Sequence, residues 1–162
     1  MLRVCGAALI IAVDIDEYRL NMASKYGVTT INPLKEDVVS TIKNLTAIRG
    51  GADLIIELTG SAKVYERLFE ILRLEGRLVT VGHPAGKVSI NITQNINLKG
   101  TSIKGVFGRR IWETWWNLSS LVDTKKIDIL DIVTHRFTFE QFNTAFEQFN
   151  TGAGKILFVK SE

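Results

Sequence analysis

The stretch Leu9-Ile10-Ile11-Ala12-Val13-Asp14 decides the fold, and the basic residue Arg19 follows five positions later. A short apolar run that ends in an acid is typical of a buried parallel strand whose last carboxylate lies at the edge of the sheet. In dinucleotide-binding folds, such an acid accepts hydrogen bonds from ribose hydroxyls. The alternative is structural, with Asp14 capping the next helix and Arg19 solvated on its surface.

The glycine-rich turn that accompanies such an acid does not precede it in this sequence. The turn usually lies about 20 residues earlier, whereas 13 residues precede Asp14 and Gly6 is their only glycine. The turn supplies backbone N–H donors and a helix N-terminus for the pyrophosphate. We therefore expect an incomplete Rossmann-like sheet that lacks its first strand and this turn.

Short apolar runs alternate with amphipathic stretches along the rest of the chain, which predicts parallel strands covered by helices on both faces. Strands are expected at residues 9–13, 28–31, 54–58, 77–81 and 102–107. Helices are expected at residues 16–26, 36–48, 64–72 and 110–123. The second is expected to turn Val39, Ile42 and Leu45 inward, and Gly76 is expected to stop the third. A strand–helix–strand tail follows at residues 133–137, 139–149 and 155–159, and its two strands are candidates to pair with each other. We predict one α/β domain, with residues 1–131 as a nucleotide-binding-type core and residues 132–162 as the tail.

Composition narrows the class of protein. With 162 residues, 46% hydrophobic and 23% charged, the chain can bury a core of its own and suits a soluble cytoplasmic protein. No apolar stretch approaches the roughly 20 residues of a membrane span. One cysteine and two histidines exclude a disulfide framework and a Cys/His zinc site. The net charge of +3 is spread thinly, with basic pairs at Arg109-Arg110 and Lys125-Lys126, so nucleic-acid binding is a weaker alternative.

Several stretches, taken in order, resemble one known family. They are Asp14-Ile-Asp-Glu-Tyr-Arg19, Ile103-Lys-Gly-Val-Phe-Gly-Arg109, Trp112-Glu-Thr-Trp115, Thr134-His-Arg-Phe137 and Gly152-x-Gly154-Lys155-Ile156. The chain resembles the zinc-containing medium-chain dehydrogenases over essentially its whole length, and within them the L-threonine 3-dehydrogenase group. The resemblance implies an NAD-binding Rossmann domain whose tail returns to a catalytic domain. It also implies oxidation of a secondary alcohol with zinc and NAD.

The resemblance implies cofactor-binding roles for specific residues. It places Asp14 and Arg19 at the adenosine end of NAD and Val106-Phe107 at the nicotinamide end. Gly82, in Val81-Gly82-His83, would let the backbone approach the cofactor closely. The structural alternatives are a tight turn at Gly82, a solvated His83 and a core strand at Val106-Phe107.

The departures from the family predict what the chain can do. The zinc-bearing amino-terminal domain is not matched, Glu57 and His135 have no catalytic partner in the sequence, and we assign no catalytic residue and no zinc to this chain. Losing two or three phosphate hydrogen bonds removes about 3–9 kcal/mol, whereas micromolar binding totals about 8 kcal/mol. We expect a truncated dehydrogenase domain that is inactive alone and binds NAD weakly or not at all. Alternatives are half of a split enzyme completed by another polypeptide, or a scaffold or nucleic-acid-binding remnant.

The missing strand also predicts partners. In the strand order 3-2-1-4-5-6 the first strand is central, so the strands at Leu9 and Leu54 would flank a gap. Either they pair directly or another chain fills the gap, because buried unpaired backbone groups cost about 1–3 kcal/mol each. We expect a homodimer, with exchanged segments as one form. Pairing of residues 102–107 across a two-fold axis is another form. Trp112, Trp115 and Trp116 share a helix face and are expected in the core or at a subunit interface.

Overall fold

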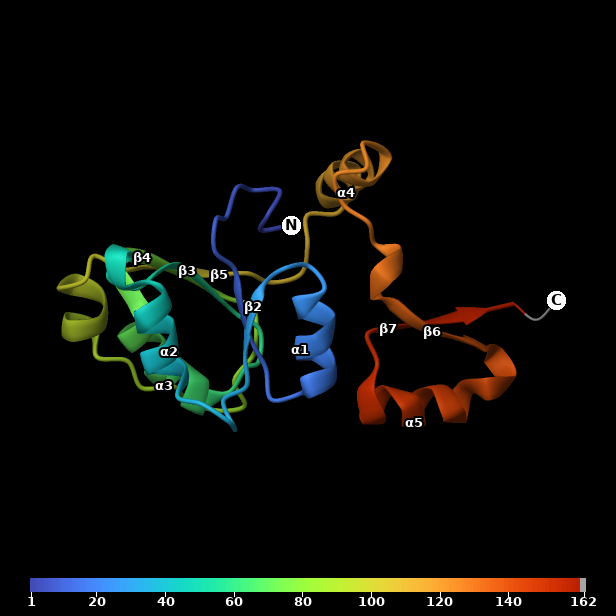
Figure 1. Ribbon diagram of the computed structural model, residues 1–162, viewed down its shortest axis with the longest axis horizontal. Helices are drawn as coiled ribbons and strands as arrows, with labels where there is room; N and C mark the ends of the chain where they lie inside the picture. Colours follow the sequence, from blue (N-terminus) through green and yellow to red (C-terminus); the bar gives the residue numbers. More distant parts are fainter. Residues whose placement is uncertain (161–162) are drawn as a thin grey trace. The chain divides into compact units, whose positions relative to one another are not determined.

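All strand pairs are parallel in this computed structural model, which describes residues 1–160. The strands form three sheets, of order β1-β2, β3-β4-β5 and β6-β7. The chain divides into two compact units, Met1–Glu36 with Arg110–Glu162 and Asp37–Arg109 (Figure 1). The predicted α/β class with parallel sheets is confirmed.

The first unit contains two of the three sheets. Its elements are β1 (Ile11–Val13), α1 (Glu17–Ser24), β2 (Thr29–Ile31), α4 (Glu113–Asp123), β6 (Val133–Thr138), α5 (Phe142–Gly152) and β7 (Lys155–Val159). Single turns of 3₁₀-helix at Leu130–Ile132 and Phe139–Gln141 lead into β6 and α5. The predicted pairing of the two tail strands is confirmed. β6 and β7 pair in parallel, from Val133 opposite Lys155 to Thr138 opposite Val159.

The second unit contains the three-stranded sheet. Its elements are α2 (Val38–Leu45), β3 (Ala52–Glu57), α3 (Ala62–Ile71), β4 (Leu72–Thr80) and β5 (Ser102–Gly105). A 3₁₀ turn at Ala47–Arg49 follows α2, and a π-helical turn at Ile92–Asn97 precedes β5.

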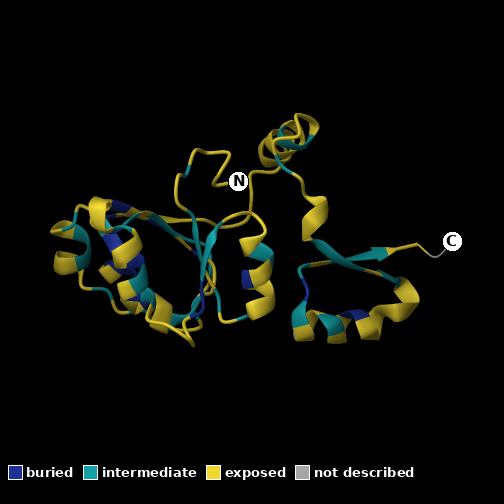
Figure 2. Ribbon diagram, viewed as in Figure 1, coloured by how far each residue is buried: buried dark blue, intermediate teal, exposed yellow. Residues whose placement is uncertain are grey.

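Helix α3 supplies most of the core of the second unit. A buried cluster joins side chains of α3 to β4, and its members are Tyr65, Leu68, Phe69, Leu72 and Leu78. Figure 2 shows buried stretches of the chain in dark blue. The spacing of the α3 residues, at i, i+3 and i+4, places them on one helix face, as the sequence predicts. Removal of this apolar surface from water is the main force that holds α3 on its sheet.

Helix α2 is shorter than predicted, and the prediction that Leu45 faces inward is wrong. Asp37 caps the helix by accepting a hydrogen bond from the Ser40 backbone N–H at 2.8 Å. Val39 and Ile42 are buried, whereas Leu45 in the last turn is 45% exposed. The reason is that the α-helix ends at Leu45, and the chain then turns into the 3₁₀ segment.

Helix α3 ends within one residue of the predicted bound at 72, but Gly76 is not the residue that terminates it. The helix ends at Ile71 and β4 begins directly at Leu72, which is 2% exposed, so Gly76 lies inside the strand. Glu75, not a glycine, adopts a positive φ of 57° within β4, where the register with β3 shifts. A hydrogen bond of 2.7 Å from the Glu75 N–H to the Lys99 carbonyl holds that conformation.

The three tryptophans do not form a core. Helix α4 begins at Glu113, so Trp112 precedes it as the N-cap residue, with φ of 71°. Trp112, Trp115 and Trp116 are 59%, 48% and 69% exposed, and Trp112 and Trp115 contact each other edge to face at 5.9 Å. Their expected place in the core is wrong, and their place at a subunit interface stays a prediction.

The strands β1 and β3 each have one partner within residues 1–160. β1 pairs only with β2, and β3 pairs only with β4. Because β1 and β3 belong to different units, direct pairing of the two strands stays a prediction. Filling of the gap by another chain stays a prediction.

Candidate functional site

Asp14 lies at the carboxyl end of β1 and is not the helix cap. Its backbone N–H extends the ladder to the Ile31 carbonyl at 3.3 Å, and its Oδ1 accepts a hydrogen bond from the Asp16 N–H at 3.0 Å. Asp16 is the N-cap of α1 and accepts a hydrogen bond from the Tyr18 N–H at 2.9 Å. The structural alternative for Asp14 is therefore wrong, and its carboxylate, 32% exposed, keeps acceptor capacity at the sheet edge.

Arg19 lies beside this carboxylate, as the sequence predicts for the pair. Its Nη1 is 3.8 Å from Asp14 Oδ2, and its Nε is 3.5 Å from Asp16 Oδ2. The Arg19 side chain is 59% exposed, so these ion pairs hold it weakly. A ligand that offers hydroxyl groups can contact both the carboxylate and the guanidinium here.

In the second unit, the carboxyl ends of β3 and β4 meet through Glu57. The Glu57 side chain accepts hydrogen bonds from the Thr59 N–H at 2.8 Å, the Thr59 hydroxyl at 2.5 Å and the Gly60 N–H at 3.1 Å. Its backbone carbonyl accepts bonds from the N–H groups of Val81 and Gly82 at 2.9 and 3.0 Å. Glu57 thus connects the loop after β3 to the loop after β4.

Gly82 is the point at which these loops touch. A Cβ at this position would lie 2.2 Å from the Gly60 nitrogen and 2.6 Å from Glu57 Oε2. The Tyr65 hydroxyl donates a hydrogen bond of 3.1 Å to the Gly82 carbonyl. The close backbone approach inferred for Gly82 exists, and the segment that approaches it is the chain's own Gly60.

Both buried acidic groups at this junction have shifted pKa values. Burial raises the pKa of the Glu57 carboxyl, but hydrogen bonds from Thr59 and Gly60 outweigh burial and hold it below its ordinary value. Burial, and secondarily the neighbouring Glu57 carboxylate, raises the pKa of the Tyr65 hydroxyl. Glu57 is therefore a charged acceptor and Tyr65 a neutral donor near neutral pH.

His83 and Phe107 come together at the same edge of the sheet. Their rings meet edge to face with centroids 6.0 Å apart, and Phe107 is 90% exposed. β5 ends at Gly105, and the Val106 N–H donates a hydrogen bond of 2.9 Å to the Thr80 carbonyl. The alternative of a core strand through Phe107 is wrong, because the chain leaves the sheet before that residue.

Sequence reasoning missed the role of Glu57. It found no partner for Glu57, whereas the structure gives this side chain, 3% exposed, three donors within the next three residues. The available signal was an acid at a strand end followed by Thr59-Gly60, whose N–H groups can turn back onto it. His135 contacts the Thr134 hydroxyl at 2.8 Å and stacks on Phe137, which is no catalytic pair.

A zinc ion does not fit the side chains present. Within residues 1–160, no three His, Cys, Asp or Glu side chains group closely enough to hold a metal ion. Cys5, the one soft ligand, is exposed and free.

No helix among these residues is long and apolar enough to cross a membrane. In the basic pair at the end of β5, Arg110 forms an ion pair of 3.2 Å with Glu113.

Comparison with known proteins defines the family. Residues 1–124 match the family described as zinc-binding dehydrogenase. The chain belongs to this family. It is 33% identical to the L-threonine 3-dehydrogenase of Bacillus subtilis strain 168 and 34% identical to that of Pyrococcus furiosus. Each alignment covers 97% of this chain and 46% of the relative, so the chain spans about half the length of these relatives.

Solved structures give the same result for the fold. Benzyl alcohol dehydrogenase from Acinetobacter calcoaceticus superposes with a TM-score of 0.88 at 28% identity, covering 98% of this chain and 44% of that one. For 2R,3R-butanediol dehydrogenase from Bacillus subtilis, the TM-score is 0.88 at 25% identity, with 99% and 46% covered. The resemblance noted in the sequence is confirmed, as is the Rossmann-like fold class.

Proposed function

We propose that this chain is the NAD-binding part of a dehydrogenase of the L-threonine 3-dehydrogenase kind, in which Asp14 and Arg19 hold the adenosine ribose. The observation that carries the proposal is the Asp14 carboxylate, which ends β1, caps no helix and lies 3.8 Å from Arg19. Ligands of open parallel sheets bind outside the carboxyl ends of the strands. The relatives that match this chain over 97% of its length support the choice of cofactor.

The nicotinamide end of the cofactor is assigned to the loops after β4 and β5. Val81, Gly82 and His83 follow β4, and Val106 and Phe107 follow β5, all at carboxyl ends of parallel strands. The exposed Phe107 ring offers a flat apolar face to a planar group, and the His83 ring contacts it edge to face. These residues position a cofactor, and none of them is assigned a step of the reaction.

Tested as the 162-residue polypeptide, the chain is proposed to be catalytically silent. Residues 1–13 offer no glycine-rich turn for the pyrophosphate. The described side chains do not fit the zinc ion that acidifies an alcohol in zinc dehydrogenases. Binding of NAD is therefore expected in the millimolar range, about 4 kcal/mol in total, and alcohol oxidation is not expected from this polypeptide alone.

Discrimination between NAD and NADP tests the assignment of Asp14. In a ¹H–¹⁵N NMR titration, NAD is expected to shift the amides of residues 14–19 with a millimolar dissociation constant. NADP should bind about tenfold or more weakly, because a carboxylate repels the 2′-phosphate. The variant Asp14→Asn should lose most of this preference, and Glu66→Gln, an exposed acid on α3, should keep it.

Two results would contradict the proposal. Equal binding of NAD and NADP by the wild-type chain would remove Asp14 from the ribose site. Micromolar binding of NAD would show that the phosphate contacts come from residues other than a glycine-rich turn.

A second candidate is one half of a split dehydrogenase, and the open edges of β1 and β3 favour it. Each of these strands has a single neighbour within residues 1–160, so each can accept one more parallel strand. A homodimer with exchanged strands would use the same edges.

Reconstitution separates the split enzyme from a silent domain. We expect mixtures with a polypeptide that carries the amino-terminal half of the Bacillus subtilis relative to reduce NAD when L-threonine is added, and neither polypeptide to do so alone. Sedimentation of the chain alone tests the homodimer. A monomer that gains no activity in the mixture would leave the silent domain as the function.

A further inference from the structure

Helix α5 and the turn before it carry an apolar stripe that their own unit leaves exposed. The phenylalanine stripe consists of Phe139, Phe142, Phe146 and Phe149, which follow β6 in the chain. Each of these side chains is 54–67% exposed, and in Figure 2 most of α5 is drawn as exposed. The buried residue of α5 is Ala145, so the stripe is left over after the helix has packed in its unit.

The rings of the stripe contact one another and the strand beside them. The centroids of the Phe142 and Phe146 rings are 4.5 Å apart. Phe139 stacks on Phe158 of β7 at 5.7 Å. These contacts restrict the side chains before any partner binds, so less conformational entropy is lost on association. The stripe is therefore a preformed apolar surface rather than a set of separate exposed residues.

The spacing of the stripe fits a second helix as the element that covers it. Its steps of three, four and three residues are those of the a and d positions of a heptad, the narrow seam by which helices pack on each other. Phe146 lies at the middle of the α5 part of the stripe, between Phe142 and Phe149. A two-fold axis beside Phe146 would bring the same seam of two copies together.

The charge of α5 favours a second copy of this chain over an acidic partner or a lipid surface. Glu147 is the only charged residue of the helix, and it points about 100° around the axis from Phe146. Two copies can therefore meet along the stripe without like charges at its centre. Nucleic acids and anionic membrane surfaces are bound through lysines and arginines, of which α5 has none.

The area of the stripe suits a weak dimer. An aromatic side chain covers about 150–250 Å², so four phenylalanines that are about 60% exposed present about 400–500 Å². Two stripes together then bury about 800–1,000 Å², which lies at the low end of specific interfaces, where association is reversible.

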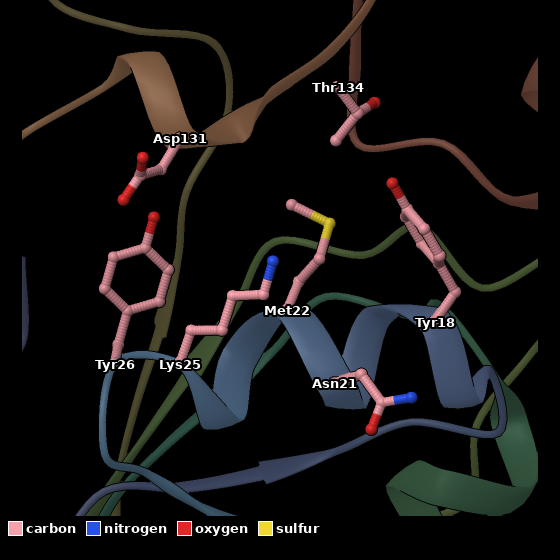
Figure 3. A pocket seen from close by; sticks show the side chains of 7 residues that line it. All are labelled: Tyr18, Asn21, Met22, Lys25, Tyr26, Asp131 and Thr134. Carbon is pink, nitrogen blue, oxygen red and sulfur yellow. The ribbon is translucent and has the colours of Figure 1, made fainter.

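A depression in the same unit contrasts with this stripe. It lies between α1 and the residues that precede β6, with a volume of about 200 Å³ (Figure 3). Its lining includes Asn21, Lys25 and Asp131, which are exposed to water. Covering such groups costs desolvation, whereas covering apolar rings is favourable. The stripe is therefore the surface that gains from a partner.

We propose that two copies of this chain associate through the phenylalanine stripe, with Phe146 of each copy at a two-fold axis. The dimer leaves the edges of β1, β3 and β5 free. It does not depend on the proposed NAD site.

Sedimentation equilibrium of the 162-residue chain, from micromolar to submillimolar concentration, tests the dimer. The wild type is expected to dimerise reversibly. Phe146→Glu should weaken the dimer about 30-fold or more, because two carboxylates would meet in an apolar contact. Phe146→Leu keeps the contact apolar and should still dimerise. Ile48→Glu places the same charge at a fully exposed apolar residue of the other unit and should leave the dimer unchanged.

A mixture of two variants separates a lost contact from a damaged fold. Phe146→Glu and Phe146→Lys should each be monomeric alone and should associate when mixed, because opposite charges then meet at the axis. A mixture that restores no dimer would overturn the proposal.

Three further results would also overturn it. One is a wild-type chain that stays monomeric at submillimolar concentration. Another is a dimer that Phe146→Glu leaves intact, which would place the interface at the sheet edges. The third is protection of the α5 amides from hydrogen exchange only after the amino-terminal half of the Bacillus subtilis relative is added, which would make that polypeptide the occupant of the stripe.

Discussion

Replacement of Glu57 by leucine is expected to lower the free energy of unfolding of the unit Asp37–Arg109 by about 3 kcal/mol or more. The Glu57 side chain is 3% exposed and accepts bonds from the Thr59 N–H, the Thr59 hydroxyl and the Gly60 N–H. Leucine fills the space but leaves these donors unsatisfied in a site with little water, and each costs about 1–3 kcal/mol. Hydrogen exchange of the β3 and β4 amides measures the loss. Tryptophan fluorescence would not report on this unit, because the tryptophans lie in the other one.

The control for this prediction is Glu57→Gln, which keeps an oxygen acceptor at Oε1 and should cost about 1 kcal/mol. The pH dependence provides a second check. Hydrogen bonds depress the folded pKa of Glu57, so its stabilisation is complete above the unfolded value near 4.5 and is lost as pH falls through the folded pKa. Glu57→Gln should remove this part of the acid sensitivity. Equal stability of the leucine variant and the wild type would show that the loops do not depend on the carboxylate.

The sequence predicts those elements whose signals are local. The run of apolar residues before Asp14 is a buried-strand pattern, and the structure has β1 at Ile11–Val13 followed by α1. The two tail strands β6 and β7 pair as predicted, with Arg136 opposite Leu157. In both cases the local pattern of apolar residues indicates an extended strand.

Burial could not be predicted in the same way. The spacing of Trp112, Trp115 and Trp116 shows that they share a face, but it does not show what covers that face, and all three are exposed. Likewise, Gly76 is a local signal for the end of a helix, but β4 already begins at Leu72, four residues earlier. Leu72 packs in the core, which favours the strand there. Tertiary packing overrides a local glycine signal when the competing residue is a core residue.

The proximity of Asp14 and Arg19 could be predicted from the sequence, but the contacts that fix the loops after β3 and β4 could not. Asp14 and Arg19 follow from strand-end chemistry, and the structure places them 3.8 Å apart. The contact between Gly60 and Gly82 depends on two loops that are about 20 residues apart in the sequence, and no local pattern reports it. An acid before Thr59-Gly60 could have indicated the Glu57 side-chain hydrogen bonds, but no local pattern indicates that Glu57 also binds the loop of Gly82.

Replacement of Gly82 by alanine is expected to destabilise the same unit by about 3 kcal/mol or more. The new Cβ would lie 2.2 Å from the Gly60 nitrogen and 2.6 Å from Glu57 Oε2. Relief requires a shift of the Gly60 backbone, which breaks its bond to the Glu57 carboxylate. That hydrogen bond involves a charged group and is worth about 1.5–3 kcal/mol, added to about 1–3 kcal/mol for overpacking. Hydrogen exchange of the β3 and β4 amides measures the change.

Gly86→Ala is the matched control, because a Cβ at Gly86 meets nothing within 4 Å and lies in the same loop after β4. Its stability should stay within about 0.5 kcal/mol of the wild type. Because the Gly82 variant displaces Gly60, the preceding Thr59 should lose protection in Gly82→Ala and keep it in Gly86→Ala. Equal behaviour of the two variants would mean that the loops after β3 and β4 do not pack as tightly as 2.2 Å implies.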